Sequence, residues 1–173
     1  SVLDAAGSAV ATLNPSRAAG VNRAVWNLRY AALPPGPPDE ESGGRSSALP
    51  GPFVMPGEYT VRLTAGGTTY EQKLQVLEDP RIQISAANRK AWTDALLAIG
   101  ETYRGAVATL ADVNRRGGPG SNGVRDVARE LQSRLATLYR DMARSTAKPT
   151  ADQQSQMQFY RTELESLQRR VSR

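Results

Sequence analysis

Apolar residues recur at every second position in the first part of the chain and at every third or fourth position in the second part. The first spacing is typical of strands with one buried face, and the second is typical of amphipathic helices. The change falls near Asp79, Pro80 and Arg81. We therefore predict a segregated α+β fold, with a small antiparallel β-sandwich over residues 1–80 and a helical domain over residues 81–173.

The longest strand signal in the first domain is the alternation between residues 21 and 30. Ala24, Trp26, Leu28 and Tyr30 fall on one side of this segment, which is the side that carries the large apolar groups. Trp26 and Leu28 are therefore expected to face the core, with Trp26 as the anchor of the sandwich.

A hairpin is expected further along the domain. Tyr59, Val61 and Leu63 alternate inward, a two-glycine turn follows at residues 66–67, and residues 69–77 supply the return strand. Two alternating runs joined by such a turn predict an antiparallel pair.

Two other parts of the first domain are less regular. Residues 33–52 are rich in Pro, Gly and Ser and are expected to form a long loop. Residues 1–4 are typical of the last residues of a strand whose first residues are missing. We therefore expect the sandwich to lack its first strand, or to be small, and the chain to be a fragment or a processed product of a larger protein.

Three helices are expected in the second domain, at about residues 86–114, 124–144 and 151–171. Ser85 can cap the first helix, and Thr150 forms a capping box with Gln153 at the start of the third. The connections between the helices are short, which favours antiparallel neighbours and an up-down-up three-helix bundle.

Each expected helix carries an apolar seam whose positions alternate by four and three residues. Trp92, Leu135 and Leu164 lie on these seams, one on each helix, and are expected to anchor a shared core. The same seams could instead join two chains as a coiled coil, and this alternative stays open.

The composition limits the chemistry that the chain can perform. Cysteine and histidine are absent, which removes thiolate nucleophiles and the side chain most used for proton transfer near neutral pH. No cofactor or metal ligation is expected.

The 22 basic and 17 acidic side chains give a net charge of +5, which does not demand a nucleic-acid partner. We interpret the arginines of the last helix as side chains of a solvent-exposed face. Since no apolar run approaches the length of a membrane span, no membrane insertion is expected.

A glycoside hydrolase needs two carboxylates held about 5–10 Å apart in a cleft. The candidates are Asp39, Glu40 and Glu41 in the long loop, with Glu58 and Asp79 at strand ends. A flexible loop does not hold such a geometry, so the chain is not expected to be an enzyme. A carboxylate-dependent hydrolase fragment stays as a minor alternative.

Three segments together resemble the C-terminal region of bacterial sortilin-like BNR-repeat proteins, which are large propellers labelled as glycosyl hydrolases. The segments are residues 19–30 (AGVNRAVWNLRY), 55–63 (MPGEYTVRL) and 76–81 (VLEDPR). Lys148, Pro149 and Thr150 fit a helix start found in the tail of that family. Asn27 departs from the pattern, since the family usually has Asp there, so no charge-based role is carried over to it.

The resemblance implies an immunoglobulin-like sandwich and a helical tail appended to a propeller in an exported protein of the periplasm or the extracellular space. The expected function is a non-catalytic structural or protein-interaction module, with an upstream propeller domain or a partner chain as its partner. Asp79 is expected to shape the turn before Pro80, and Arg81 to tie that junction to the sandwich. A glycan-binding accessory module is the alternative, with Tyr30 as the candidate surface contact.

Overall fold

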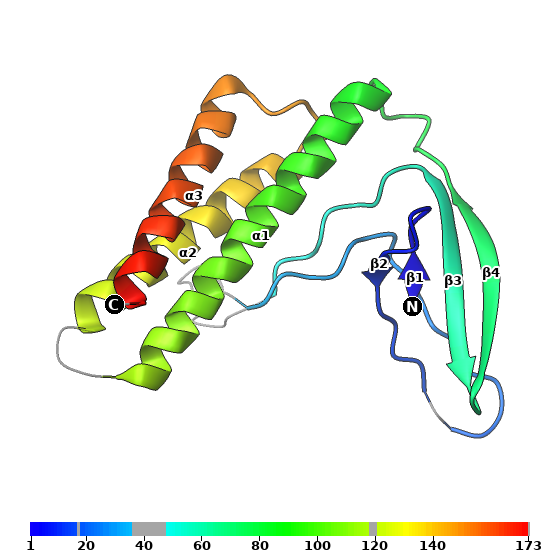
Figure 1. Ribbon diagram of the computed structural model, residues 1–173. Helices are drawn as coiled ribbons and strands as arrows, with labels where there is room; N and C mark the ends of the chain where they lie inside the picture. The colour runs from blue at the N-terminus through cyan, green and yellow to red at the C-terminus, as the bar shows by residue number, and fades with distance from the viewer. Residues whose placement is uncertain (17, 36–47, 118–120, 173) are drawn as a thin grey trace. The chain divides into compact units, whose positions relative to one another are not determined.

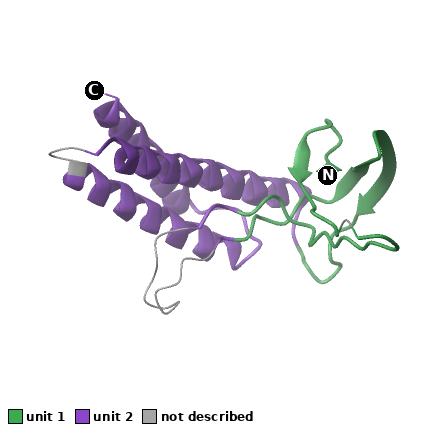
Figure 2. Ribbon diagram, turned by 90° about the horizontal axis from the view of Figure 1, so that it is seen from below, with its two compact units in different colours: residues 1–32, 50–83 green, residues 33–49, 84–173 purple. Residues whose placement is uncertain are grey.

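The computed structural model describes residues 1–16, 18–35, 48–117 and 121–172 of the chain (Figure 1). Four strands come first and three helices follow, which confirms the predicted α+β order. The chain divides into two compact units, coloured separately in Figure 2. The sheet unit comprises Ser1–Ala32 and Pro50–Gln83, and the helical unit comprises Leu33–Leu49 and Ile84–Arg173.

The sheet unit contains β1 (Val2–Leu3), β2 (Ala9–Ala11), β3 (Gly57–Ala65) and β4 (Thr68–Val76). Its sheet is antiparallel, with the strand order β2-β1-β3-β4. The predicted hairpin is present as β3 and β4, which pair along their whole length. Gly66 and Gly67 form its turn with φ values of +56° and +79°. A two-residue turn with both central residues in the left-handed region matches the twist of the flanking strands, and glycine adopts it without strain.

A small apolar core supports this sheet. Its buried members are Val2, Val10, Ala11, Val54, Tyr59 and Val76, and the half-buried Leu13, Trp26 and Tyr30 pack against them. The Trp26 ring meets the Tyr59 ring edge-on, with 5.5 Å between the ring centroids. The Trp26 indole N–H donates to the carbonyl of Arg29 at 2.9 Å. Trp26 therefore covers the core while its one polar group stays paired.

The predicted strand over residues 21–30 is not formed. Leu28, which was expected to face the core, is 42% exposed and has a φ of +58°. The Asn27 side chain accepts a hydrogen bond from the backbone N–H of Arg29 at 3.2 Å, which closes a local turn at this point. Arg29 then pairs with Phe53 as an isolated bridge. The turn breaks the alternation, and this corrects the prediction for Leu28.

The helical unit contains α1 (Ala86–Arg116), α2 (Ser121–Ala143) and α3 (Ala151–Val171). The predicted caps are in place. The Ser85 hydroxyl accepts from the N–H of Asn88 at 3.2 Å. Thr150 and Gln153 exchange hydrogen bonds of 3.2 Å and 2.9 Å as a capping box. Each cap satisfies N–H groups that the first turn of a helix leaves without a partner.

The three helices bury one apolar core, as their seams predict. Trp92, Leu135 and Leu164 are all buried in it, at 3%, 1% and 7% exposure. Leu33 and Leu49, from the ends of the predicted long loop, are buried in the same core. The Leu33 side chain fills the space above Gly100, where a Cβ atom would come within 2.9 Å of it. These two leucines therefore belong with the helices. Residues 36–47 of the loop lie outside the described residues.

Trp92 also makes a buried polar contact that joins α1 to the end of α2. Its indole N–H donates to the carbonyl of Met142 at 2.8 Å. Met142 lies in the last turn of α2, where carbonyls lack a partner within the helix. The indole thus satisfies a carbonyl that would otherwise be buried without a hydrogen bond.

Replacing Trp92 by Phe keeps an aromatic ring and removes this donor. We expect the helical unit to lose about 1–3 kcal/mol of unfolding free energy, because the Met142 carbonyl is left buried and unpaired. Urea denaturation followed by far-ultraviolet circular dichroism measures the change. The control is Trp26→Phe in the sheet unit, which should leave the helical transition in place. A Trp92→Phe loss below about 0.5 kcal/mol, the range of ordinary surface substitutions, would contradict this role.

Candidate functional site

A cleft of about 780 Å³ opens in the sheet unit at the beginning of β1. Residues 62–66 of β3 and its turn form one wall, residues 12–16 after β2 form the other together with Asn22, and Ser1 lies at one end. β1 pairs with β2 on one side and with β3 on the other. The cleft therefore continues the line of β1 between its two neighbours.

The backbone of β3 has hydrogen-bonding groups that face this cleft. Ser1 and Arg62 exchange two hydrogen bonds, N–H to carbonyl in both directions, at 2.9 Å and 2.8 Å. In an antiparallel pair, every second residue points its N–H and carbonyl toward the same neighbour. Thr64 therefore directs both groups into the cleft, and within the described residues no backbone partner meets them there.

The side chains of the cleft alternate in the same way. Leu63 belongs to the side of β3 that carries Tyr59 and Val61, and it is 52% exposed. The half-buried Leu13 lines the opposite wall. An apolar side chain between Leu13 and Leu63 would extend the core, so the polarity pattern of the cleft matches that of one extended strand.

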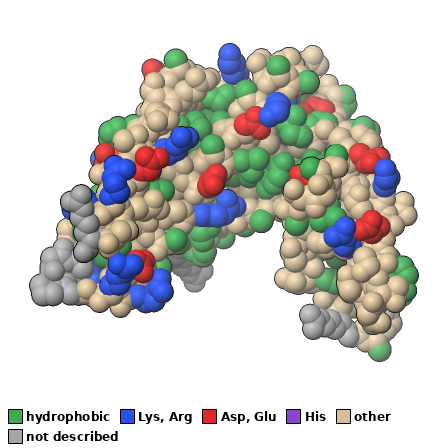
Figure 3. Space-filling view, in the orientation of Figure 1, with side chains coloured by type: hydrophobic (Ala, Val, Ile, Leu, Met, Phe, Trp, Pro, Cys, Tyr) green, Lys and Arg blue, Asp and Glu red, His purple; other side chains and the backbone are tan. Residues whose placement is uncertain are grey.

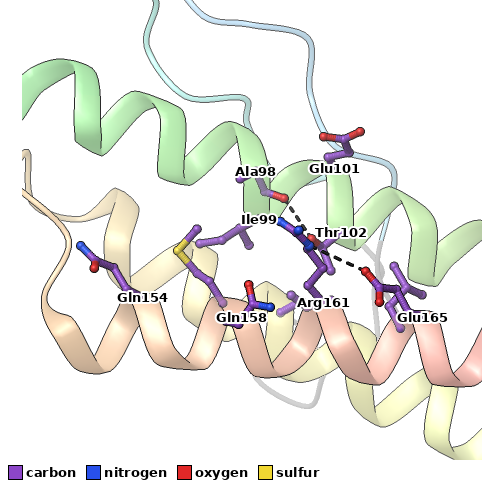
Figure 4. A pocket seen from close by; sticks show the side chains of 11 residues that line it. Ala98, Ile99, Glu101, Thr102, Gln154, Gln158, Arg161 and Glu165 are labelled. Carbon is purple, nitrogen blue, oxygen red and sulfur yellow. Dashed lines mark hydrogen bonds and ion pairs between the residues drawn. The ribbon is translucent and has the colours of Figure 1, made fainter.

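The helical unit has a groove of about 430 Å³ between α1 and α3 (Figure 4). Its apolar lining comes from Ile99, Leu135, Met157 and Leu164, and its rim is polar. The polar groups of the rim pair locally. The Thr102 hydroxyl donates to the carbonyl of Ala98 at 3.0 Å, and Arg161 lies 3.8 Å from Glu165 on the same helix. Figure 4 shows Glu101 pointing away from α3, so these groups do not converge on one point.

A second groove of about 430 Å³ lies between α2 and α3. Phe159 and Val127 line it and are 57% and 38% exposed. Arg134 and Glu130 pair at 2.6 Å along the α2 side of its rim, and this carboxylate raises the pKa of Arg134. The groove thus has an exposed apolar floor beside the Arg134–Glu130 ion pair.

The predicted anchors of the sheet unit occupy different environments. Tyr59 is buried, Val61 is half-buried, and Tyr30 is half-buried against the sheet core. The Asp79 carboxylate accepts from the backbone N–H of Arg81 at 2.9 Å and pairs with its guanidinium, which lowers the pKa of Asp79. Arg81 therefore closes the turn locally, and within the described residues its recorded pairing is with Asp79 and not with the sheet.

The two candidate carboxylates that the structure describes, Glu58 and Asp79, each pair with a separate basic side chain. Glu58 pairs with Lys73 at 2.7 Å, and Asp79 pairs with Arg81. Asp39, Glu40 and Glu41 lie outside the described residues. Over the part of the chain that the structure covers, no group of three or more Asp and Glu side chains could hold a metal ion. Acidic and basic side chains lie next to one another across the face drawn in Figure 3.

None of the helices in the described part of the chain is long and apolar enough to cross a membrane.

Two features of these surfaces were missed from the sequence. The cleft is assembled from three segments that are distant along the chain, which spacing along the sequence does not bring together. Phe159 had a visible signal, because it lies off the seam that runs through Met157, Tyr160 and Leu164. A large aromatic residue at an outward position of an amphipathic helix indicates an exposed apolar surface.

Comparisons with protein-family models, with curated proteins and with solved structures find no match to this chain.

Gln132 and Tyr103 form a buried polar pair in the helical unit. The Gln132 side-chain amide donates to the Tyr103 hydroxyl at 3.4 Å, and both residues are buried. Among the described residues the Gln132 Oε1 atom has no hydrogen-bond partner. Burial raises the pKa of the Tyr103 hydroxyl and outweighs the hydrogen bond from Gln132 and the charge of Arg140, which lower it.

This pKa shift predicts a loss of stability at alkaline pH. Because the pKa is higher in the folded state, Tyr103 ionises first in the unfolded chain, and its contribution is complete below about pH 10 and lost as the pH rises through the folded pKa. We expect the melting temperature of the helical unit to fall above about pH 10, and to fall less steeply in Tyr103→Phe. Circular dichroism melts across this range measure both slopes. Tyr70→Phe removes a tyrosine of the sheet unit and serves as the control for the helical transition. Equal slopes in all three proteins would contradict the assignment.

Proposed function

We propose that the chain is a non-catalytic protein-interaction module, composed of an immunoglobulin-like sandwich and an up-down-up helical bundle, and that its sheet receives an extended strand. The upstream propeller domain or a partner chain would supply that strand. The observation that supports this proposal is the cleft that continues β1 between residues 12–16 and residues 62–66.

Strand addition explains the chemistry of the cleft better than binding of a small molecule does. One wall offers the N–H and carbonyl groups of Thr64, and apolar side chains stand at Leu13 and Leu63. Main-chain hydrogen bonds supply affinity in this mode of recognition, and alternate side chains supply specificity. Proton transfer would instead need convergent titratable groups, whereas Glu58 and Asp79 are each held by a neighbouring cation.

The location in an exported propeller protein is part of the proposal, and it is supported by the resemblance of residues 19–30, 55–63 and 76–81 to the sortilin-like BNR-repeat proteins. The half-buried Trp26 and Tyr30, which both lie in the first of these segments, pack against the sheet core. In an immunoglobulin-like sandwich, these two residues would belong to the second layer, which packs against the sheet.

The proposal is tested by placing the residues Thr-Val-Thr-Val ahead of Ser1. In the register of β1 and β3, Val2 lies opposite Val61, so the added valines fall opposite Leu63 and Ala65 and a threonine falls opposite Thr64. We expect the melting temperature of the sheet unit to rise by about 4–8 °C, which corresponds to about 1 kcal/mol. The amide of Thr64 should exchange its hydrogen at least about tenfold more slowly, because it gains a partner.

Two matched extensions separate strand addition from a general effect of length. Thr-Val-Pro-Val removes the N–H that would face the Thr64 carbonyl, and Thr-Asp-Thr-Asp places charges beside Leu63. Both should leave the exchange of the Thr64 amide and the melting temperature near those of the unextended chain. If all three extensions behave alike, the cleft does not accept a strand and the proposed function fails.

A further inference from the structure

Within the described part of the chain, the outer edge of β4 pairs with no other strand, and it is separate from the cleft. β4 is the last strand in the sheet order, and Figure 1 shows β3 as its neighbour on one side. It is exposed from Thr68 to Gln75. A nine-residue edge strand presents a row of backbone groups that can pair with another chain.

The pairing of β3 fixes which backbone groups face outward. Since Arg62 bonds to Ser1, Arg62 and the opposite Glu71 form a non-hydrogen-bonded pair within the hairpin. Glu71 and Lys73 therefore point their N–H and carbonyl groups away from β3, as do Thr69 and Gln75. Within the described residues the recorded contact to these outward groups is a long one, from the side chain of Gln72 to the carbonyl of Lys73 at 3.4 Å.

The sequence of β4 is complementary to itself when read in the opposite direction. If two copies of Thr68–Val76 pair antiparallel along their whole length, Gln72 lies at the centre. Glu71 then lies opposite Lys73 of the second copy, and Tyr70 lies opposite Leu74 of the second copy. Tyr70 and Leu74 are 59% and 38% exposed, so this arrangement covers both.

Charge selects this register over its neighbours. Outward backbone groups meet only when the register shifts by an even number of residues. A shift by two in one direction places Glu71 opposite Glu71 of the second copy, and a shift by two in the other direction places Lys73 opposite Lys73. Like charges directly opposite each other destabilise a strand pair.

Ion pairs inside the hairpin would continue across this interface. Arg62 lies 2.7 Å from Glu71, and Glu58 lies 2.7 Å from Lys73. Pairing of two copies would produce a row in which Arg62 and Glu71 of one copy are followed by Lys73 and Glu58 of the other. The signs alternate along the whole row. Exposed ion pairs contribute little stability, but an alternating row specifies register and partner.

We propose that β4 pairs antiparallel with β4 of a second copy about a twofold axis at Gln72, forming one continuous sheet across a homodimer. The interface contains roughly eight backbone hydrogen bonds, two for each hydrogen-bonded pair. An interface of this size is weak, with a Kd on the order of 10–100 µM. The occupant of this edge is thus the chain itself, while the cleft beside Ser1 is left open for a different segment.

Sedimentation equilibrium over about 5–500 µM protein tests the dimer, in a range set around the expected Kd. The mass should approach that of two chains at the upper end. Glu71→Lys alone and Lys73→Glu alone should each remain monomeric, because each places like charges opposite each other in the pairing register. Glu101→Lys on α1, which carries the same change of charge, should dimerise as the unmodified chain does.

An equimolar mixture of the Glu71→Lys and Lys73→Glu proteins is the decisive arm. In the mixed pair every charge on one copy of β4 again faces an opposite charge, so a heterodimer should form although neither protein associates alone. Any effect of a substitution on its own β3–β4 hairpin is the same in the single protein and in the mixture. Such an effect therefore cannot explain why only the mixture associates.

Three results would overturn the proposal. They are a monomer throughout the concentration range, a dimer that both single substitutions leave unchanged, and a mixture that does not associate. Hydrogen exchange adds a measurement that needs no variant, since the amides of Glu71 and Lys73 should be protected only at high concentration. Protection of Thr64 by an added strand is independent of concentration, so failure of the dimer and failure of the proposed function are distinguishable.

Discussion

β3 is nine residues long, whereas β1, its partner on one side, has only two. This mismatch sets the properties of the sheet unit, because backbone groups that gain no partner must face solvent or another chain. β4 matches β3 residue for residue, so the hairpin is complete. Among the residues that the structure describes, backbone groups of the sheet without a recorded partner therefore lie along the second half of β3 beside Ser1 and along the outer edge of β4.

The helical unit is under a different constraint. An α-helix pairs the N–H and carbonyl groups of its own backbone, so only its apolar side chains have to be buried against another element. α1 and α2 both contribute small buried residues to the shared core, namely Ala106 and Ala128. At Gly105 an added Cβ atom would lie 2.7 Å from Leu164, so α3 approaches α1 closely there. The grooves on either side of α3 lie where the contacting side chains are longer and partly exposed.

The helices and the hairpin could be predicted because local sequence determines them. The seams through Trp92, Leu135 and Leu164, the cap at Thr150 and the two-glycine turn each act within a few residues. The strand expected at Leu28 failed because alternation is necessary for a strand but does not provide a partner, and Asn27 closes a turn instead. The burial of Leu33 and the cleft beside Ser1 depend on segments far apart along the chain, which spacing alone does not reveal.

The same physical reasoning separates the chemistry of the two open edges. At the cleft, one wall offers backbone groups flanked by Leu13 and Leu63, so an incoming strand is selected by its apolar alternation and carries no charge requirement. At β4 the side chains beside the backbone include Glu71 and Lys73, and a strand paired there must present opposite charges in the right order. A general peptide satisfies the first condition easily, whereas the reversed sequence of β4 satisfies the second. Backbone pairing is common to both edges, and the side chains decide which partner each edge accepts.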